Sequence, residues 1–110
     1  MYVQVDLAPT PPVVTLEEPD DVQRFHVSVV GGDRAAPDSL AMVYAALVDA
    51  APGRLEGDDA WIAVDAVRRM AHGRVGPGWD ADLDGMLGYA RTKGWLDENG
   101  YAIRAHVEWA

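Results

Sequence analysis

The segment from Asp80 to the end of the chain constrains the fold more than any other part. Apolar residues recur at helical spacing between Asp80 and Gly94, at Leu83, Leu87 and Ala90. Asp80 is a suitable N-cap, and Gly94 is a suitable left-handed residue just beyond the helix. We therefore expect an amphipathic helix that begins near Asp80 and ends at Gly94.

A β-hairpin is predicted to follow this helix over residues 95–109. Asn99-Gly100 is the dipeptide most favourable to a type I′ turn, which requires positive φ at both residues. After the turn, one face of the strand is apolar and the other polar, with Tyr101, Ile103, Ala105, Val107 and Trp109 on the apolar face. This alternation fixes the register of the second strand.

Two further helices are predicted upstream. The first runs from Pro37 to Ala51, where Pro52-Gly53 ends it, and its expected core residues are Leu40, Val43, Leu47 and Ala50. The second begins at Asp58-Asp59 and stops at Gly73, with a stripe of Trp61, Val64, Val67 and Ala71.

The N-terminal third has strand patterns separated by proline and acidic residues. Residues 2–7 alternate and are stopped by Pro9, so they predict a short edge strand. Residues 13–16 and 23–30 predict two more strands, and Gly31-Gly32 ends the last of them.

Three helices followed by a hairpin resemble the winged helix-turn-helix superfamily, over residues 37–109. The resemblance is to the order of elements and not to a catalytic motif. It implies an α+β fold with a winged-helix-like domain at 37–110, preceded by an N-terminal β extension and proline-rich loop at 1–36. It also implies a short strand at Arg54-Leu55-Glu56. The third helix would be the recognition helix of a DNA-binding protein.

Composition limits the classes of function. A chain of 110 residues with 49% hydrophobic residues fits one domain. It has no cysteine, which excludes disulfides and thiolate chemistry, and its first residues form neither a signal peptide nor a membrane span, so we expect a cytoplasmic protein. The net charge of -9 repels polyanions, and Asp80, Asp82 and Asp84 occupy the start of the would-be recognition helix.

Basic residues gather in one predicted patch at the end of the second helix, joined by one from the hairpin: Arg68, Arg69, His72, Arg74 and Arg104. This patch is either a phosphate or nucleic-acid site or a set of ordinary solvated charges at a helix C-terminus. The sequence predicts weak, unselective DNA binding.

Residues 80–85 match the first half of an EF-hand calcium loop. The twelfth position of the loop, where calcium needs a bidentate glutamate, is Arg91. We therefore expect no metal and no cofactor. The alternative interpretation is a helix whose first turn carries acids at its positive end.

Four residues are candidate anchors for a partner. Trp79 and Trp109 lie near element ends and are expected to be exposed, whereas Trp61 and Trp95 are expected in the core. Gly85 and Gly88 each lower the stability of a helix by about 1 kcal/mol relative to alanine. Their presence therefore favours a surface on which another backbone packs closely.

These observations predict a non-catalytic protein-interaction or adaptor module. It would bind a basic partner through its acidic surface, or itself, as a homodimer joined through the N-terminal strands. A DNA-binding transcription regulator is the alternative. A small enzyme is the second alternative, although only His26, His72 and His106 supply imidazoles and no nucleophile motif accompanies them.

Overall fold

Within the residues that the structure describes, the chain forms one mixed β-sheet of six strands with three helices. The computed structural model describes residues 1–50 and 53–110. The strands in chain order are β1 (Tyr2–Asp6), β2 (Val13–Glu17), β3 (His26–Val30), β4 (Gly53–Glu56), β5 (Asp59–Ala63) and β6 (Ala102–Trp109). The helices are α1 (Pro37–Ala50), α2 (Val64–Ala71) and α3 (Trp79–Lys93).

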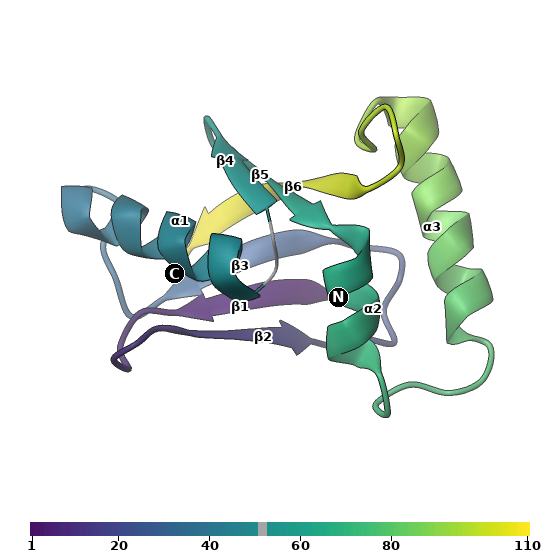
Figure 1. The fold of residues 1–110 in the computed structure, drawn as a ribbon, viewed down its shortest axis with the longest axis horizontal. Helices are drawn as coiled ribbons and strands as arrows, with labels where there is room; N and C mark the ends of the chain where they lie inside the picture. Colours follow the sequence, from purple (N-terminus) through teal and green to yellow (C-terminus); the bar gives the residue numbers. More distant parts are fainter. Residues whose placement is uncertain (51–52) are drawn as a thin grey trace.

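Within the sheet the strand order is β2-β1-β3-β6-β5-β4 (Figure 1). The pairs β1–β2, β4–β5 and β5–β6 are antiparallel, whereas β1 with β3 and β3 with β6 are parallel. The C-terminal strand therefore lies in the middle of the sheet. It joins an N-terminal group of three strands to the β4–β5 hairpin.

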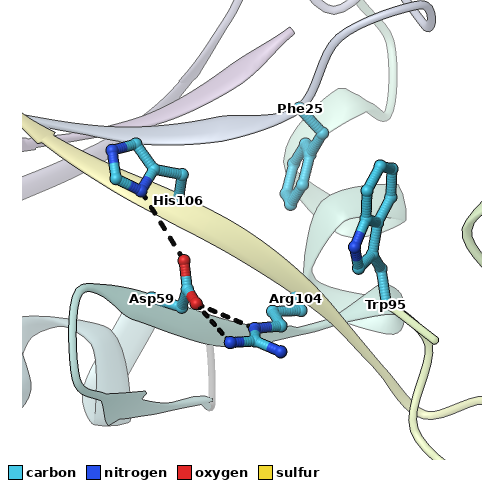
Figure 2. Close-up of a pocket in the computed structure, with 5 residues that line it drawn as sticks. All are labelled: Phe25, Asp59, Trp95, Arg104 and His106. Carbon is cyan, nitrogen blue, oxygen red and sulfur yellow. Dashed lines mark hydrogen bonds and ion pairs between the residues drawn. The ribbon is translucent and has the colours of Figure 1, made fainter. Parts of the chain in front are cut away.

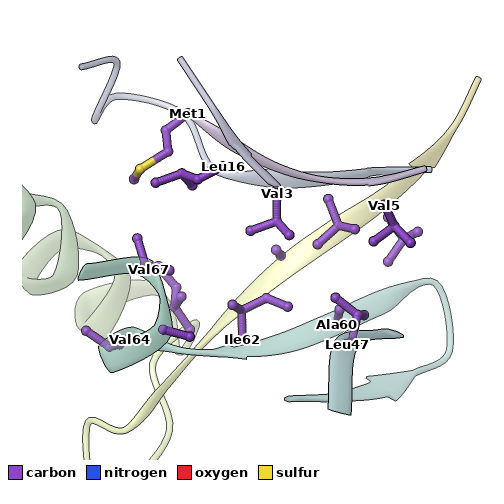
Figure 3. Close-up of a cluster of buried hydrophobic side chains, with 14 of the residues drawn as sticks. Met1, Val3, Val5, Leu16, Leu47, Ala60, Ile62, Val64 and Val67 are labelled. Atoms are coloured by element: carbon purple, nitrogen blue, oxygen red, sulfur yellow. The ribbon is translucent and has the colours of Figure 1, made fainter. Parts of the chain in front are cut away.

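The hydrophobic core lies on one face of the sheet, beneath α1 and α2 (Figure 3). Alternate residues of the strands point into it and are fully buried, among them Val3, Val5, Val27, Val29 and Ile62. α1 contributes Val43 and Leu47, and α2 contributes Val64 and Val67. The strict alternation of buried and exposed positions along β6 follows the period of a strand packed on one side.

α3 lies at one end of the sheet instead of over its core face (Figure 1). Leu83 and Ala90 are buried, as predicted, and Gly94 ends the helix in the left-handed conformation with φ of 75°. The helix begins one residue before Asp80, so Gly78 and not Asp80 is its N-cap.

The predicted winged-helix architecture is wrong. The structure is a sheet-rich α+β fold with strands at both ends of the chain, and it does not contain a three-helix bundle with a wing. Within residues 1–36, β1 and β3 are interior strands of the same sheet as β4, β5 and β6. The prediction of β1 as an edge strand is wrong for this reason, and β2 forms that edge.

The second predicted helix is wrong in its first half. Residues 59–63 form β5, and α2 begins only at Val64. β5 pairs with β4 on one side and with β6 on the other, so Ala60 and Ile62 are buried as strand residues. Pairing on both sides outweighs the weak helical preference of this segment.

The hairpin is confirmed in its second strand only. The segment before the turn does not form a regular strand, and a single bridge joins its Leu96 to Ile103 of β6. Gly100 N–H donates to the carbonyl of Asp97, and Gly100 has φ of 74°. Glu18 is the only non-glycine residue of the described ranges with positive φ, so Asn99 does not adopt the predicted type I′ conformation.

α1 confirms the first predicted helix up to Ala50. Its predicted end at Ala51 and Pro52 lies outside the described residues. Val43 and Leu47 are in the core as expected, but Leu40 is 47% exposed, so its prediction as a core residue is wrong. The short strand predicted at Arg54-Leu55-Glu56 is present as β4.

Candidate functional site

The face of the sheet opposite α1 and α2 carries several polar and aromatic contacts. We call it the open face. The register places His106 opposite both His26 of β3 and Asp59 of β5, and Arg104 opposite Trp61. Since side chains alternate along a strand, these residues share the face that does not point into the core.

Five residues at the α3 end of the open face line a pocket of about 410 Å³ (Figure 2). Asp59 comes from β5, and Arg104 and His106 from β6. Phe25 precedes β3, and Trp95 follows α3. In Figure 2 the rings of Phe25 and Trp95 stand side by side above β6, next to Arg104.

Asp59 holds the polar part of the pocket together. Nε and Nη2 of Arg104 both donate to Oδ2 of Asp59, at 2.8 and 2.6 Å. Nδ1 of His106 lies 3.6 Å from Oδ1 of the same carboxylate. On the neighbouring strand, Nε2 of His26 lies 3.6 Å from Glu108, and its ring stacks on Tyr2 with 4.9 Å between centroids. The guanidinium charge in the pocket is thus matched by one carboxylate.

A second hollow adjoins the pocket on the side of α3. Phe25, Trp95 and Arg104 line both hollows, and Met86 and Tyr89 of α3 line the second, which measures about 80 Å³. The rings of Tyr89 and Trp95 meet edge to face at 6.0 Å, and Nζ of Lys93 lies 5.6 Å from the Tyr89 ring. We call the two hollows together the aromatic groove. Its lining consists of Gln23, Arg24, Phe25, Asp59, Met86, Tyr89, Ala90, Trp95, Ile103, Arg104 and His106.

The groove brings one imidazole and one carboxylate close together. His106 and Asp59 could form an acid–base pair, but their 3.6 Å separation exceeds a hydrogen bond. The described residues that line the 410 Å³ pocket include no serine, threonine, lysine or tyrosine that could act as a nucleophile. Across residues 1–50 and 53–110, no three histidine or acidic side chains converge as metal ligands.

The structure separates the predicted basic patch into parts. Arg68 lies between two aspartates of α3, with 2.8 Å hydrogen bonds to both Asp80 and Asp84. The hydrogen bond to Asp84 is the main cause that raises the pKa of Arg68 above its ordinary value. Nη1 of Arg74 donates to the carbonyl of Leu16, 2.6 Å away. His72 lines a hollow of about 280 Å³ with Arg68.

Arg69 lies in the last turn of α2. Arg104 is on the open face, where it pairs with Asp59. Asp80 and Asp84, which the winged-helix resemblance placed at the start of a recognition helix, are partly neutralised by Arg68 of the same chain.

The four predicted anchors also differ from expectation. Trp79 is 6% exposed, and its Nε1 donates to the carbonyl of Pro19 at 2.6 Å, so it is a core residue. Trp109 is half-buried against the core. A Cβ at Gly85 or Gly88 would meet no atom within 4 Å, so no part of the chain packs closely there. Conversely, Trp95 is 43% exposed, whereas Trp61 is buried as predicted.

Calcium is expected to leave the thermal midpoint of the protein unchanged. Residues 80–85 lie within α3, so their side chains radiate around a helix instead of converging as in a calcium loop. A ligand that bound only the folded state would stabilise it by about 2.7 kcal/mol at one hundred times its dissociation constant. Thermal melts with 5 mM Ca²⁺ or 5 mM Mg²⁺ measure this, and a rise with calcium alone that Asp82→Ala removes would contradict the expectation.

Sequence reasoning missed the aromatic groove as a site. Its residues come from five separate parts of the chain, and neither Phe25, Met86 nor Tyr89 belongs to a motif. The only available signal was the polar face of β6, on which Arg104 and His106 alternate with buried residues.

None of the helices in the described part of the chain has the length and apolar character needed to cross a membrane. No protein-family model, curated protein or solved structure matches this chain.

Proposed function

We propose that the chain is a non-catalytic protein-interaction module and that the aromatic groove receives a side chain of the partner protein. The observation that supports this most is the lining of the groove. Phe25, Met86, Tyr89, Trp95 and Arg104 belong to the residue types that are enriched in protein interfaces. Tyr89 is 58% exposed and Trp95 43%, so both offer apolar surface that a partner could cover.

The charges around the groove indicate the kind of partner. The Arg104 guanidinium already has the Asp59 carboxylate as its counter-ion, so the side chain that enters beside Phe25 and Trp95 would be aromatic or aliphatic. The chain as a whole has 18 acidic and 9 basic residues. A partner with basic residues around its anchor would be steered toward this surface.

A DNA-binding function has less support. Phosphate contacts need several cations that are free of carboxylates, and Arg68 and Arg104 are both paired within the chain. The cytoplasmic setting expected from the sequence is retained as part of the proposed function.

A peptide-display experiment tests the proposal while the partner is still unidentified. A library of random twelve-residue peptides is selected on the folded protein, with Trp95→Ala as the counter-selection target. Enriched peptides are expected to carry an aromatic or large aliphatic residue flanked by lysine or arginine. Titration calorimetry is expected to show that Trp95→Ala weakens their binding about thirty-fold, the loss expected of a hot spot worth about 2 kcal/mol.

Tyr101→Ala is the matched control. Tyr101 is 74% exposed and lies outside the groove lining, so this variant removes an exposed aromatic ring without changing the groove. It should bind the selected peptides as the unchanged protein does. The proposal fails if no sequence is enriched, or if the enriched peptides bind Trp95→Ala and the unchanged protein equally well.

A further inference from the structure

α1 is apolar on more of its circumference than the sheet can cover. Of its fourteen residues only Asp38, Ser39 and Asp49 are strongly polar. Val43 and Leu47 are fully buried against the sheet. Leu40, Tyr44 and Val48 recur every four residues in the row beside them and are 47%, 53% and 46% exposed. We call this row the α1 stripe.

The apolar surface continues beyond the helix. Leu40 also lines a hollow of about 140 Å³ that contains Leu55, Val107 and Trp109. The lining of this hollow also includes the Arg34–Asp58 ion pair, which is self-neutralising. A surface helix of a soluble protein ordinarily presents polar side chains outward, so an exposed apolar row next to an apolar hollow indicates a contact surface.

We infer that the α1 stripe is a homodimerisation surface, on which the stripe of a second copy of this chain packs. This inference is independent of the proposed function, because the stripe shares no residue with the aromatic groove.

The α1 stripe is a part of the surface where two copies of this chain can meet with little charge repulsion. Two molecules of net charge -9 repel each other over most of their surface, and the α1 stripe contains no charged side chain. A partner chosen by its basic charge would find no carboxylate within the stripe. The uncharged stripe of a second copy can pack against this one without leaving a charged side chain unpaired in the contact.

Geometry also fits a twofold arrangement. Residues four apart form the ridge that interdigitates with the same ridge of a second helix at a crossing angle of about -50°. In a twofold dimer both molecules use the same surface patch, so the patch must be complementary to itself. A single straight row of apolar side chains meets this requirement. A fourteen-residue helix is about 21 Å long. The contact would therefore bury less than the roughly 1,200 Å² at which standard interfaces begin, and it would be reversible.

The sequence suggested a dimer joined through the N-terminal strands, but the sheet edge that these strands form is less suitable for pairing than the α1 stripe. β2 is the edge strand on that side, and Arg74 donates a hydrogen bond to the Leu16 carbonyl of this strand. Pro11 and Pro12 precede β2 and offer no N–H. Both features limit pairing with a further strand.

Sedimentation velocity of the full chain tests the inference over 5–500 µM, at 50 and 500 mM NaCl. The mass is expected to rise with concentration from 11.9 kDa toward twice that value. The rise should be larger at 500 mM NaCl, because salt screens the repulsion between like-charged molecules while leaving apolar packing intact. Binding of a basic partner through acidic residues would have the opposite salt dependence.

Tyr44→Glu and Val48→Glu are expected to keep the protein monomeric throughout, with at least a ten-fold loss of association. Tyr101→Glu is the control, since it adds the same charge at an exposed aromatic outside the stripe. Circular dichroism confirms that each variant is folded. The inference is overturned if the unchanged protein stays monomeric at 500 µM in both salts, or if a dimer persists in both stripe variants.

Discussion

Removal of residues 1–36 is expected to leave residues 37–110 unfolded. The loss takes away β1, β2 and β3, which are half of the strands of the sheet. It exposes the inner edge of β6, and it removes the fully buried side chains of Val3, Val5, Val27 and Val29 from the core. A domain of this size is stabilised by about 5–15 kcal/mol, and burial of each such side chain contributes about 1.5–3 kcal/mol.

Far-UV circular dichroism and a proton–nitrogen NMR spectrum of the shortened chain measure the outcome. The full chain should unfold cooperatively in urea, whereas the shortened one should show no transition and poor dispersion of amide signals. A dispersed spectrum and a cooperative transition for residues 37–110 would instead establish a second half that folds by itself.

Trp79→Ala is expected to lower the free energy of unfolding by about 3–5 kcal/mol, the range for truncation of a buried tryptophan. Trp79 is 6% exposed at the first position of α3, and its indole donates to the carbonyl of Pro19. The side chain therefore joins the start of α3 to the loop between β2 and β3. Its removal leaves a cavity and an unpaired carbonyl at the same place.

Two variants separate these contributions in urea titrations. Trp79→Phe keeps an aromatic ring but loses the hydrogen bond, so it should cost less than Trp79→Ala by about 2 kcal/mol or more. Trp95→Ala removes the same type of side chain from a position that is 43% exposed, and it should cost about 1 kcal/mol. Equal losses for Trp79→Ala and Trp95→Ala would show that Trp79 does not hold α3 in place.

Local patterns predicted the elements whose identity depends on neighbouring residues. The three N-terminal strands, the cores of the first and third helices, and the strand 102–109 follow from alternation, helical spacing and end signals. These signals act over a few residues. They operate in the same way whether an element lies at the edge or in the interior of a sheet.

Long-range pairing explains the errors. Asp58-Asp59 before an alanine-containing segment favours a helix start, yet residues 59–63 are held as a strand by β4 and β6. The parallel pairing of β3 with β6 joins segments from opposite ends of the chain, and no local pattern encodes that choice of partner. The winged-helix prediction is wrong because residues 59–63 form a strand and because strands from both ends of the chain pair in one sheet.

The candidate site depends on the same long-range pairing. Phe25, Asp59 and Arg104 meet because β3, β5 and β6 are neighbours, and Trp95 joins them because Gly94 turns the chain back toward β6. A tryptophan just after a helix was reasonably expected to be buried. Its exposure follows from the position of α3 at the end of the sheet and not over it.

The central position of β6 determines the order in which the sheet can assemble. β1–β2 and β4–β5 are hairpins of neighbouring segments, so each can form early. The contact that unites them pairs Val29 with Trp109, about eighty positions later, and such distant pairing slows folding. Until β6 arrives, β3 and β5 each present an unpaired edge to other unfinished chains. Aggregation during refolding should therefore compete with the arrival of this one strand, and dilute protein should refold in higher yield than concentrated protein.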